Sequence, residues 1–292
     1  MIEHLVLSGA GPYGMVQMGI FRQCIKQQRL VMANVKSVHA TSAGALLTCV
    51  TCLGVDIEVV YDYFLERPWN KWANYDLYNL NTTKGLLNRK HVRDMLAPLF
   101  QSIDLPVEIT MAEAFAYCKV PFYFYATDAE SMQCVEINHE SFPDMPVIDA
   151  VAATTAAFPV FAPVNYGGKV YLDGALRENF PMLRASKRIS DLSTVLAINV
   201  EFPQMAFGED IKLLNFMFYI CHRAIFDPEE IEKNKKMGER THYIGFMVNS
   251  KQDFYEDFLG VFEHREKRLQ LLELGAHIYE QKCRGIVLCS ES

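Results

Sequence analysis

His39-Ala40-Thr41-Ser42-Ala43-Gly44-Ala45 is the stretch of sequence that decides the fold. The apolar run from Val35 to His39 predicts a strand that enters it, and the run from Ala43 to Leu53 predicts a helix that leaves it. Ser42 is therefore expected at a sharp strand-to-helix turn, where the hydroxyl projects from the backbone and the first helix amides face any negative charge beside it. Taken alone, the pattern also fits an ordinary serine N-cap.

A glycine-rich loop follows the first predicted strand, residues 4–8. The loop is Gly9-Ala10-Gly11-Pro12-Tyr13-Gly14, and a helix is predicted from Met15 to Gln27. The G-x-G-x-x-G spacing is typical of dinucleotide sites, but these need an acidic residue about 20 positions later. The chain has no Asp or Glu from His4 to Val55. A dinucleotide site that reads a 2′-phosphate with Arg29 or Lys36 stays open, but the proline inside the loop disfavours it. The loop has two other interpretations: an oxyanion hole built from converging amides, or a plain tight turn.

Two carboxylates come at the ends of predicted strands. The strand from Lys169 to Leu172 leads into Asp173-Gly174-Ala175, and the strand from Val120 to Thr127 leads into Asp128. The carboxyl end of a buried strand is where α/β sheets keep their active sites. An isolated Asp-Gly is also a turn signal, and for Asp128 a turn cap is the favoured interpretation.

The remaining elements form a predicted scaffold. A capping box at Thr110 opens one further helix. Periodicity predicts further helices over Arg89–Gln101, Val147–Ala157, Asp227–Arg240 and Phe262–Lys282, and strands over Gln133–Asn138, Val195–Val200 and Tyr243–Val248. The apolar run Leu213–Phe226 is too short to span a bilayer, and Arg284–Ser292 fits either a short strand or a tail.

Length and composition favour one globular domain over residues 1–292, with the motifs in a core of about 4–181 and an extension of helices and a strand over 211–292. Hydrophobic residues make up 50% and charged residues 22%, which argues against long disorder. The net charge of -7 gives no reason to expect nucleic acid and disfavours charge-driven binding to anionic membranes. Without a signal-peptide pattern, we expect a soluble, cytoplasmic protein whose membrane contact is at most transient and peripheral.

Cysteine and histidine positions favour packing over chemistry. The eight cysteines lie mostly in apolar runs, which predicts reduced thiols, and the C-x-x-C of Cys49 and Cys52 has no second pair to complete a metal site. His39 borders the serine turn but belongs to the entering strand, so we interpret it as a core residue. No histidine has the sequence context of a triad base, although a distant one such as His222 or His242 stays open.

The glycine loop, the serine turn and the late Asp-Gly-Ala, in this order, resemble the patatin-like phospholipase family. The resemblance covers roughly residues 4–181 and includes Ala152 to Pro163, which is similar to the small-residue helix and Phe/Pro loop before the family's aspartate. It implies an α/β three-layer sandwich with a mixed, largely parallel central sheet and helices on both faces. It also implies a phospholipase A-type lipid acyl hydrolase acting on phospholipids or other acyl lipids.

The same resemblance implies a Ser/Asp dyad that requires no metal or cofactor. Ser42 would be the nucleophile and Asp173 the base, in agreement with the need of a serine hydroxyl for a neighbouring proton acceptor. The oxyanion hole would come from the backbone amides of Gly9, Ala10 and Gly11. The residues that would support these motifs by their small size are Gly14, Ala40, Gly44, Gly174 and Ala175.

Three positions depart from the family pattern. Ala40 replaces the first glycine of the serine turn, which is tolerable if the backbone there does not need a positive φ. Ala10 and Tyr13 stand where many relatives have glycine and a basic residue. Tyr13 removes a positive charge near the oxyanion loop, which bears on rate and substrate preference more than on reaction type, because the oxyanion donors are backbone amides.

Both tryptophans lie in the aromatic segment Asp56–Asn81, which fits a cap over an acyl pocket, an interfacial patch, or a helical insertion packed on the core. Two alternative functions stay open. One is a small-ester esterase or thioesterase that uses the same dyad. The other is a catalytically weak lipid-binding protein that kept the fold.

Overall fold

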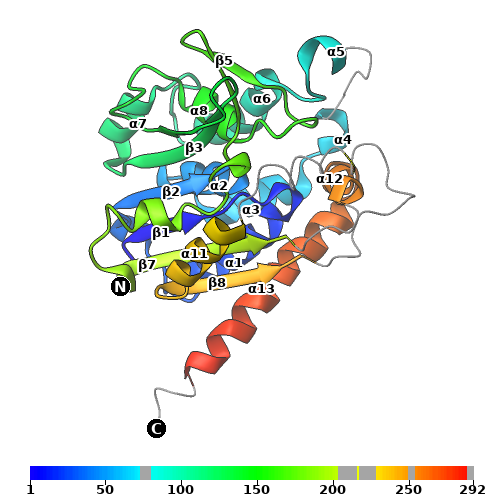
Figure 1. The fold of residues 1–292 in the computed structure, drawn as a ribbon. Coiled ribbons are helices and arrows are strands. Elements are labelled where there is room, and N and C mark those ends of the chain that lie inside the picture. Colours follow the sequence, from blue (N-terminus) through cyan, green and yellow to red (C-terminus); the bar gives the residue numbers. More distant parts are fainter. Residues whose placement is uncertain (73–79, 203–215, 217–227, 249–253, 288–292) are drawn as a thin grey trace.

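A central sheet organises the computed structural model, which describes residues 1–72, 80–202, 216, 228–248 and 254–287. Within these residues the sheet has eight strands in the order β5-β6-β3-β2-β1-β7-β8, and β4 pairs with β3 (Figure 1). The strands are β1 His4–Leu7, β2 Ser37–Thr41, β3 Phe122–Asp128, β4 Cys134–Ile137, β5 Val164–Tyr166, β6 Lys169–Asp173, β7 Val195–Glu201 and β8 His242–Met247.

The sheet is mixed, as predicted. Strands β3, β2, β1, β7 and β8 are parallel to one another, whereas β4, β5 and β6 pair antiparallel at the β3 side. The predicted strand over Gln133–Asn138 is present as β4, which pairs antiparallel with the preceding strand, β3. The parallel strands place their carboxyl ends at one edge of the sheet, where α/β proteins form sites.

Helices cover both faces of this sheet, and the alternation of side chains along the strands assigns each face. Leu5 and Leu7 of β1 point into the larger hydrophobic cluster, whereas Val6 between them points into a separate cluster on the other face. Over the described residues the helices are α1 Gly14–Lys26, α2 Ala43–Cys52, α3 Ile57–Glu66, α4 Trp69–Trp72, α5 Leu80–Thr83, α6 Arg89–Gln101, α7 Met111–Cys118, α8 Val147–Thr154, α9 Met182–Ala185, α11 Pro228–Gly238, α12 Phe254–Glu263 and α13 Arg265–Val287. The predicted three-layer sandwich is confirmed.

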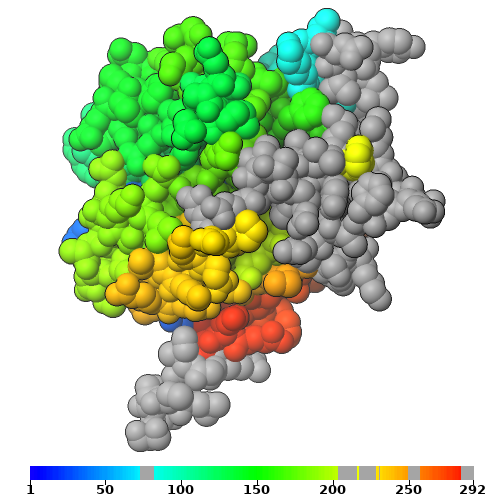
Figure 2. Space-filling view, viewed as in Figure 1, coloured from blue at the N-terminus to red at the C-terminus, as the bar shows by residue number. Residues whose placement is uncertain are grey.

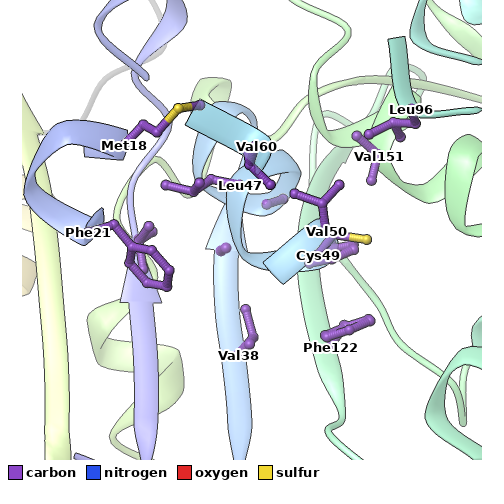
Figure 3. Close-up of a cluster of buried hydrophobic side chains, with 14 of the residues drawn as sticks. Met18, Phe21, Val38, Leu47, Cys49, Val50, Val60, Leu96, Phe122 and Val151 are labelled. Atoms are coloured by element: carbon purple, nitrogen blue, oxygen red, sulfur yellow. The ribbon is translucent and has the colours of Figure 1, made fainter. Parts of the chain in front are cut away.

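On the larger side, α2 is the central buried helix. Its Leu47, Cys49 and Val50 lie in the cluster between α1, β2 and β3 (Figure 3). On the other face α11 packs on α9, and Figure 2 shows the atoms of α11 in yellow to orange. Leu183 N donates a hydrogen bond to Asn234 Oδ1 at 2.7 Å. Cys49 is fully buried, and the cysteines in the described part of the chain are free, in agreement with the prediction of reduced thiols.

Local sequence signals account for most element boundaries. The predicted capping box is present, because Thr110 N donates to Glu113 Oε2 at 2.9 Å and Glu113 N donates to Thr110 Oγ1 at 3.2 Å. The predicted helix Phe262–Lys282 is wrong in one respect. The chain forms two helices there, with His264 between α12 and α13, so that α12 packs on α4 while α13 packs on α1.

The C-terminal predictions have mixed outcomes. The strand interpretation of Arg284–Ser292 is wrong where it can be checked, because α13 continues to Val287, and residues 288–292 lie outside the described residues. The apolar run Leu213–Phe226 also lies outside them, apart from residue 216. Among the described helices, none combines the length and the hydropathy needed to cross a bilayer.

Helices α1 and α13 cross at a pair of glycines. A Cβ atom built on Gly275 would lie 2.2 Å from the carbonyl oxygen of Val16, and one built on Gly19 would lie 2.2 Å from that of Leu272. Both distances are far below van der Waals contact with rigid backbone atoms. The two helix backbones therefore approach so closely that neither position accepts a side chain without moving a helix.

We expect Gly275→Ala to lower the free energy of unfolding by about 1–3 kcal/mol, because overpacking forces the two helices apart. Urea denaturation of wild type and variant measures this change. The matched control is Gly260→Ala in α12, where the added Cβ would meet only Lys267 Cγ at 3.6 Å. Equal stability of the Gly275 variant and this control would contradict the close crossing.

Candidate active site

Ser42 lies at the predicted turn between β2 and α2. Its backbone has φ 52° and ψ -123°, a conformation that favours glycine and is strained for a residue with a side chain. Ser42 N donates to Thr154 Oγ1 at 2.9 Å, and this hydroxyl in turn donates to the carbonyl oxygen of Tyr125. These bonds from α8 and β3 hold the turn, and α2 begins at the next residue, so its first amides lie beside Ser42.

Two strand ends bring Ser42 and Asp173 together. Strand β3 pairs with β4 along one edge, and along its other edge it pairs first with β2 and then with β6. Thr41, the last residue of β2, pairs with Tyr125, and Asp173, the last residue of β6, pairs with the next residue, Ala126. Because β6 runs antiparallel to β2, the carboxyl ends of these two strands meet.

The Asp173 carboxylate contacts the serine hydroxyl directly. Ser42 Oγ donates to Asp173 Oδ2 at 2.8 Å, and the amide of Ala175 donates to Asp173 Oδ1 at 2.7 Å. Burial of Asp173 raises its pKa to about 7, and the two hydrogen bonds from Ala175 and Ser42 oppose this rise. A carboxyl group with a pKa near neutrality beside a hydroxyl has the properties of a general base.

The glycine loop lies against Ser42. A Cβ atom on Gly9 would be 3.3 Å from Ser42 Cβ and 2.5 Å from Asn179 Oδ1, so the loop approaches the serine closely. The Gly9 amide already donates to the carbonyl oxygen of Asn179 at 3.0 Å. For the amides of Ala10 and Gly11, the described part of the chain provides no acceptor. These two amides are therefore the available donors of the loop.

The small residues around the motifs permit close contacts. A Cβ on Gly174 would lie 2.0 Å from the Tyr125 carbonyl oxygen, one on Gly44 would lie 2.7 Å from that of Ser8, and one on Gly14 would lie 2.8 Å from Ala43 Cβ. Ala40 is buried within β2 and is absent from the positions with positive φ. Alanine in place of the usual glycine there is therefore accommodated.

An apolar cavity of about 130 Å³ opens beside Ser42. Gly11 of the glycine loop forms part of its wall. Phe64 and Trp69 of the aromatic segment line the cavity, and Trp69 is only 2% exposed. These two aromatic side chains thus form a wall of the cavity and also belong to the core. Residues 73–79 of the aromatic segment lie outside the described residues. Other apolar walls come from Met15, Leu46, Met95, Val160, Phe258 and Phe262.

The other candidate residues have structural roles or lie away from the site. Asp128 Oδ1 accepts hydrogen bonds from the amides of Glu130 and Ser131 at 3.0 and 2.9 Å, which confirms the turn cap. His39 is fully buried and its Nδ1 is 3.1 Å from Tyr125 Oη, which confirms a core residue. Burial lowers its pKa to about 3.

The two distant histidines do not join the site in what the structure describes. His242 begins β8 at the amino edge of the parallel strands, opposite the edge that carries Ser42. His222 lies outside the described residues. Among the residues that are described, no cluster of three or more His, Cys, Asp or Glu side chains is arranged to hold a metal ion.

Sequence reasoning missed two parts of this site. Thr154 lies in the predicted helix Val147–Ala157, but no local signal indicates that its hydroxyl accepts a hydrogen bond from the backbone amide of Ser42. Phe258, Val261 and Phe262 of α12 line the cavity, but they lie more than 200 residues after Ser42 and carry only a helical apolar pattern. Nothing in such a pattern indicates which surface it covers.

The strained turn makes a stability prediction. We expect Ser42→Gly to exceed Ser42→Ala in free energy of unfolding by about 1 kcal/mol, because glycine adopts positive φ without the Cβ penalty. Ser42→Ala is the matched control, since it also lacks the hydroxyl but keeps Cβ. Chemical denaturation of both variants measures the difference. A more stable alanine variant would show that the turn is not strained.

The buried carboxyl makes a second prediction, with a defined pH dependence. A group whose pKa is higher in the folded state than its unfolded value binds its proton more tightly in the folded protein, so stability falls as pH rises between the two values. For Asp173, with a pKa raised from 3.8 to about 7, this loss is at most about 4 kcal/mol. The stability of Asp173→Asn relative to wild type should therefore increase from pH 4 to pH 7 and level off above. A pH-independent difference would contradict the raised pKa.

Comparison with known proteins gives the family. A relative among curated proteins is probable lipid hydrolase 463L of Invertebrate iridescent virus 6, which is 20% identical over 181 residues. The matched region covers 61% of this chain. It spans only 61% of the length of that relative.

Solved structures with a similar arrangement include VipD from Legionella pneumophila, at a TM-score of 0.49 and 14% identity over 93% of this chain and 67% of that chain. The type III effector ExoU, from the type III secretion system of Pseudomonas aeruginosa, gives a TM-score of 0.48 and 16% identity over 97% of this chain and 53% of that chain. The model of the Patatin-like phospholipase family matches residues 5–186. Because this match covers more than half of the sequence, the chain belongs to the patatin-like phospholipase family.

Proposed function

We propose that this protein is a lipid acyl hydrolase that cleaves fatty-acyl esters of phospholipids with Ser42 as nucleophile and Asp173 as general base. The observation that carries the proposal is the direct bond of 2.8 Å from Ser42 Oγ to Asp173 Oδ2, together with the apolar cavity that Ser42 lines. Membership of the family and the lipid hydrolase relative support the class of reaction.

In the first half of the reaction, Asp173 accepts the hydroxyl proton while Ser42 Oγ attacks the ester carbonyl carbon. The carbonyl oxygen becomes an oxyanion, and the amides of Ala10 and Gly11 are the donors proposed to stabilise it, together with the dipole at the start of α2. The Gly9 amide, which binds Asn179, supports the shape of the loop in this scheme. Protonated Asp173 then gives its proton to the departing alcohol, and the acyl group remains on Ser42.

In the second half, Asp173 takes a proton from water, and the resulting hydroxide attacks the acyl-serine ester. Collapse of the tetrahedral intermediate breaks the bond to Ser42 Oγ, which recovers its proton from Asp173, and releases the fatty acid. A pKa near 7 suits both directions of proton transfer at neutral pH. The base must be ionised for attack, so this scheme predicts a rate that rises with pH through the pKa of Asp173.

The lining of the cavity supports an acyl chain as the group next to the reacting ester. Aromatic and aliphatic side chains surround it, and a hydrocarbon that enters gains by leaving water. Phe158 is 37% exposed and lies in the sequence between Ala157 and Val160, both of which line the cavity. This exposed ring supports transient contact with the lipid surface from which the substrate comes.

We expect Ser42→Ala and Asp173→Asn each to lower hydrolysis of phosphatidylcholine vesicles by at least about 1,000-fold, because each removes a group that acts in both steps. Mass spectrometry of the released fatty acids and lysolipids measures the rate and identifies the products. Circular dichroism establishes that the variants fold. Asp128→Asn is the matched control, since it also changes an aspartate at a strand end, and it should keep near-normal turnover per folded molecule.

Other outcomes decide between the alternatives. Near-normal turnover by folded Asp173→Asn would overturn the dyad. Equal rates on vesicles and on a short soluble ester would favour the small-ester esterase or thioesterase. Absence of Ser42-dependent labelling by a fluorophosphonate would favour a lipid-binding protein that kept the fold.

A further inference from the structure

The end of the glycine loop is bound to a helix from the far end of the chain. Tyr13 closes the short 3-10 helix Gly11–Tyr13, is only 2% exposed, and donates its phenol hydrogen to Asp257 Oδ2 in α12, 244 residues away. The other oxygen of Asp257 lies 2.5 Å from Lys267 Nζ in α13. A carboxylate that accepts a hydrogen bond and pairs with a cation makes a stronger contact than a neutral pair.

Helix α12 also forms a wall of the apolar cavity beside Ser42. Phe258, next to Asp257, and Val261 and Phe262, one turn further, line the cavity together with Gly11 and Pro12 of the loop. Figure 1 shows α12 next to α4, and the two helices are in contact. One surface of α12 therefore touches both the loop that carries the proposed oxyanion donors and the space proposed for the acyl chain.

The glycine loop has few internal features that fix its conformation. Gly11 has φ 51°, a conformation open to glycine in particular, and the helical segment has only three residues. Oxyanion donors act well only when their positions are set before the reaction. The anchoring of Tyr13 at one end, with the Gly9 amide bound to Asn179 at the other, restrains the two amides between them.

Resting on the proposed function, we propose that Asp257 is a positioning residue that holds the oxyanion loop through Tyr13. Its loss would leave the loop free to shift, and a shift of the donors by about 1 Å can cost a large part of the rate. The role is separate from that of its neighbour Phe258, which shapes the cavity. The two roles predict different responses to acyl-chain length.

The test uses the chain of 292 residues with p-nitrophenyl butyrate and p-nitrophenyl decanoate. We expect Tyr13→Phe and Asp257→Ala each to lower kcat about tenfold on both esters with little change in KM, because the oxyanion forms whatever the chain length. The double variant should lose no more than the more severe single variant, since both remove one contact. Asp257→Asn, which keeps an oxygen acceptor, should recover part of kcat.

Two control variants separate positioning from simple structural support. Phe258→Ala should impair the decanoate and spare the butyrate. Tyr243→Phe removes another tyrosine–carboxylate bond, to Glu201 at 2.9 Å in the β7–β8 pair, and should leave kcat unchanged. Thermal unfolding of all variants shows whether any loss of kcat follows a loss of folded protein.

Three outcomes would each overturn the inference: unchanged kcat in Tyr13→Phe and Asp257→Ala, losses that add in the double variant, or losses confined to the decanoate. In each case Ser42-dependent turnover, and so the proposed function, would stay intact. A wild-type protein without Ser42-dependent turnover would overturn the proposed function and the inference with it.

Discussion

Two strands of opposite direction share one edge of β3, and the arrangement of the candidate site depends on this pairing. β2 and β6 pair with consecutive parts of that edge, so the last residue of one strand lies beside the last residue of the other. Ser42 and Asp173 are 131 positions apart in the sequence, yet the ladder of β3 leaves their side chains at hydrogen-bond distance. The pairing, rather than any flexible loop, sets the distance between them.

Both Ser42 and Asp173 are held in states that cost free energy of folding. Ser42 has a backbone conformation that costs about 1–3 kcal/mol, and Asp173 lies in an environment that disfavours its charge. The surrounding elements hold them in place: α8 binds the Ser42 amide through Thr154, and the core around α2 fixes the helix that begins beside it (Figure 3). Strain concentrated in an otherwise well-packed sheet is the pattern expected of a functional site.

Local patterns were enough to predict most strands and helices, because the alternation of buried residues and the caps are encoded within each segment. The Ser42 turn, the turn cap at Asp128 and the core role of His39 followed from such signals. The antiparallel direction of β6 and its position on β3 next to the end of β2 depend on pairing between distant segments. Only the family resemblance therefore predicted that Asp173 lies beside Ser42. Tyr13 was interpreted as a lost charge, whereas it is bound by a carboxylate from α12 that no local pattern indicates.

The central sheet continues beyond the region that matches the family, because β1 pairs with β7, which begins at Val195. The family match ends at residue 186, but β7 and β8 complete the parallel side of the sheet, and α13 packs on α1 through its glycine crossing. A fragment cut at that limit would uncover one edge of β1 and the outer surface of α1, which begins at the end of the glycine loop. Residues beyond the family match thus pack against the strand and the helix that flank the glycine loop.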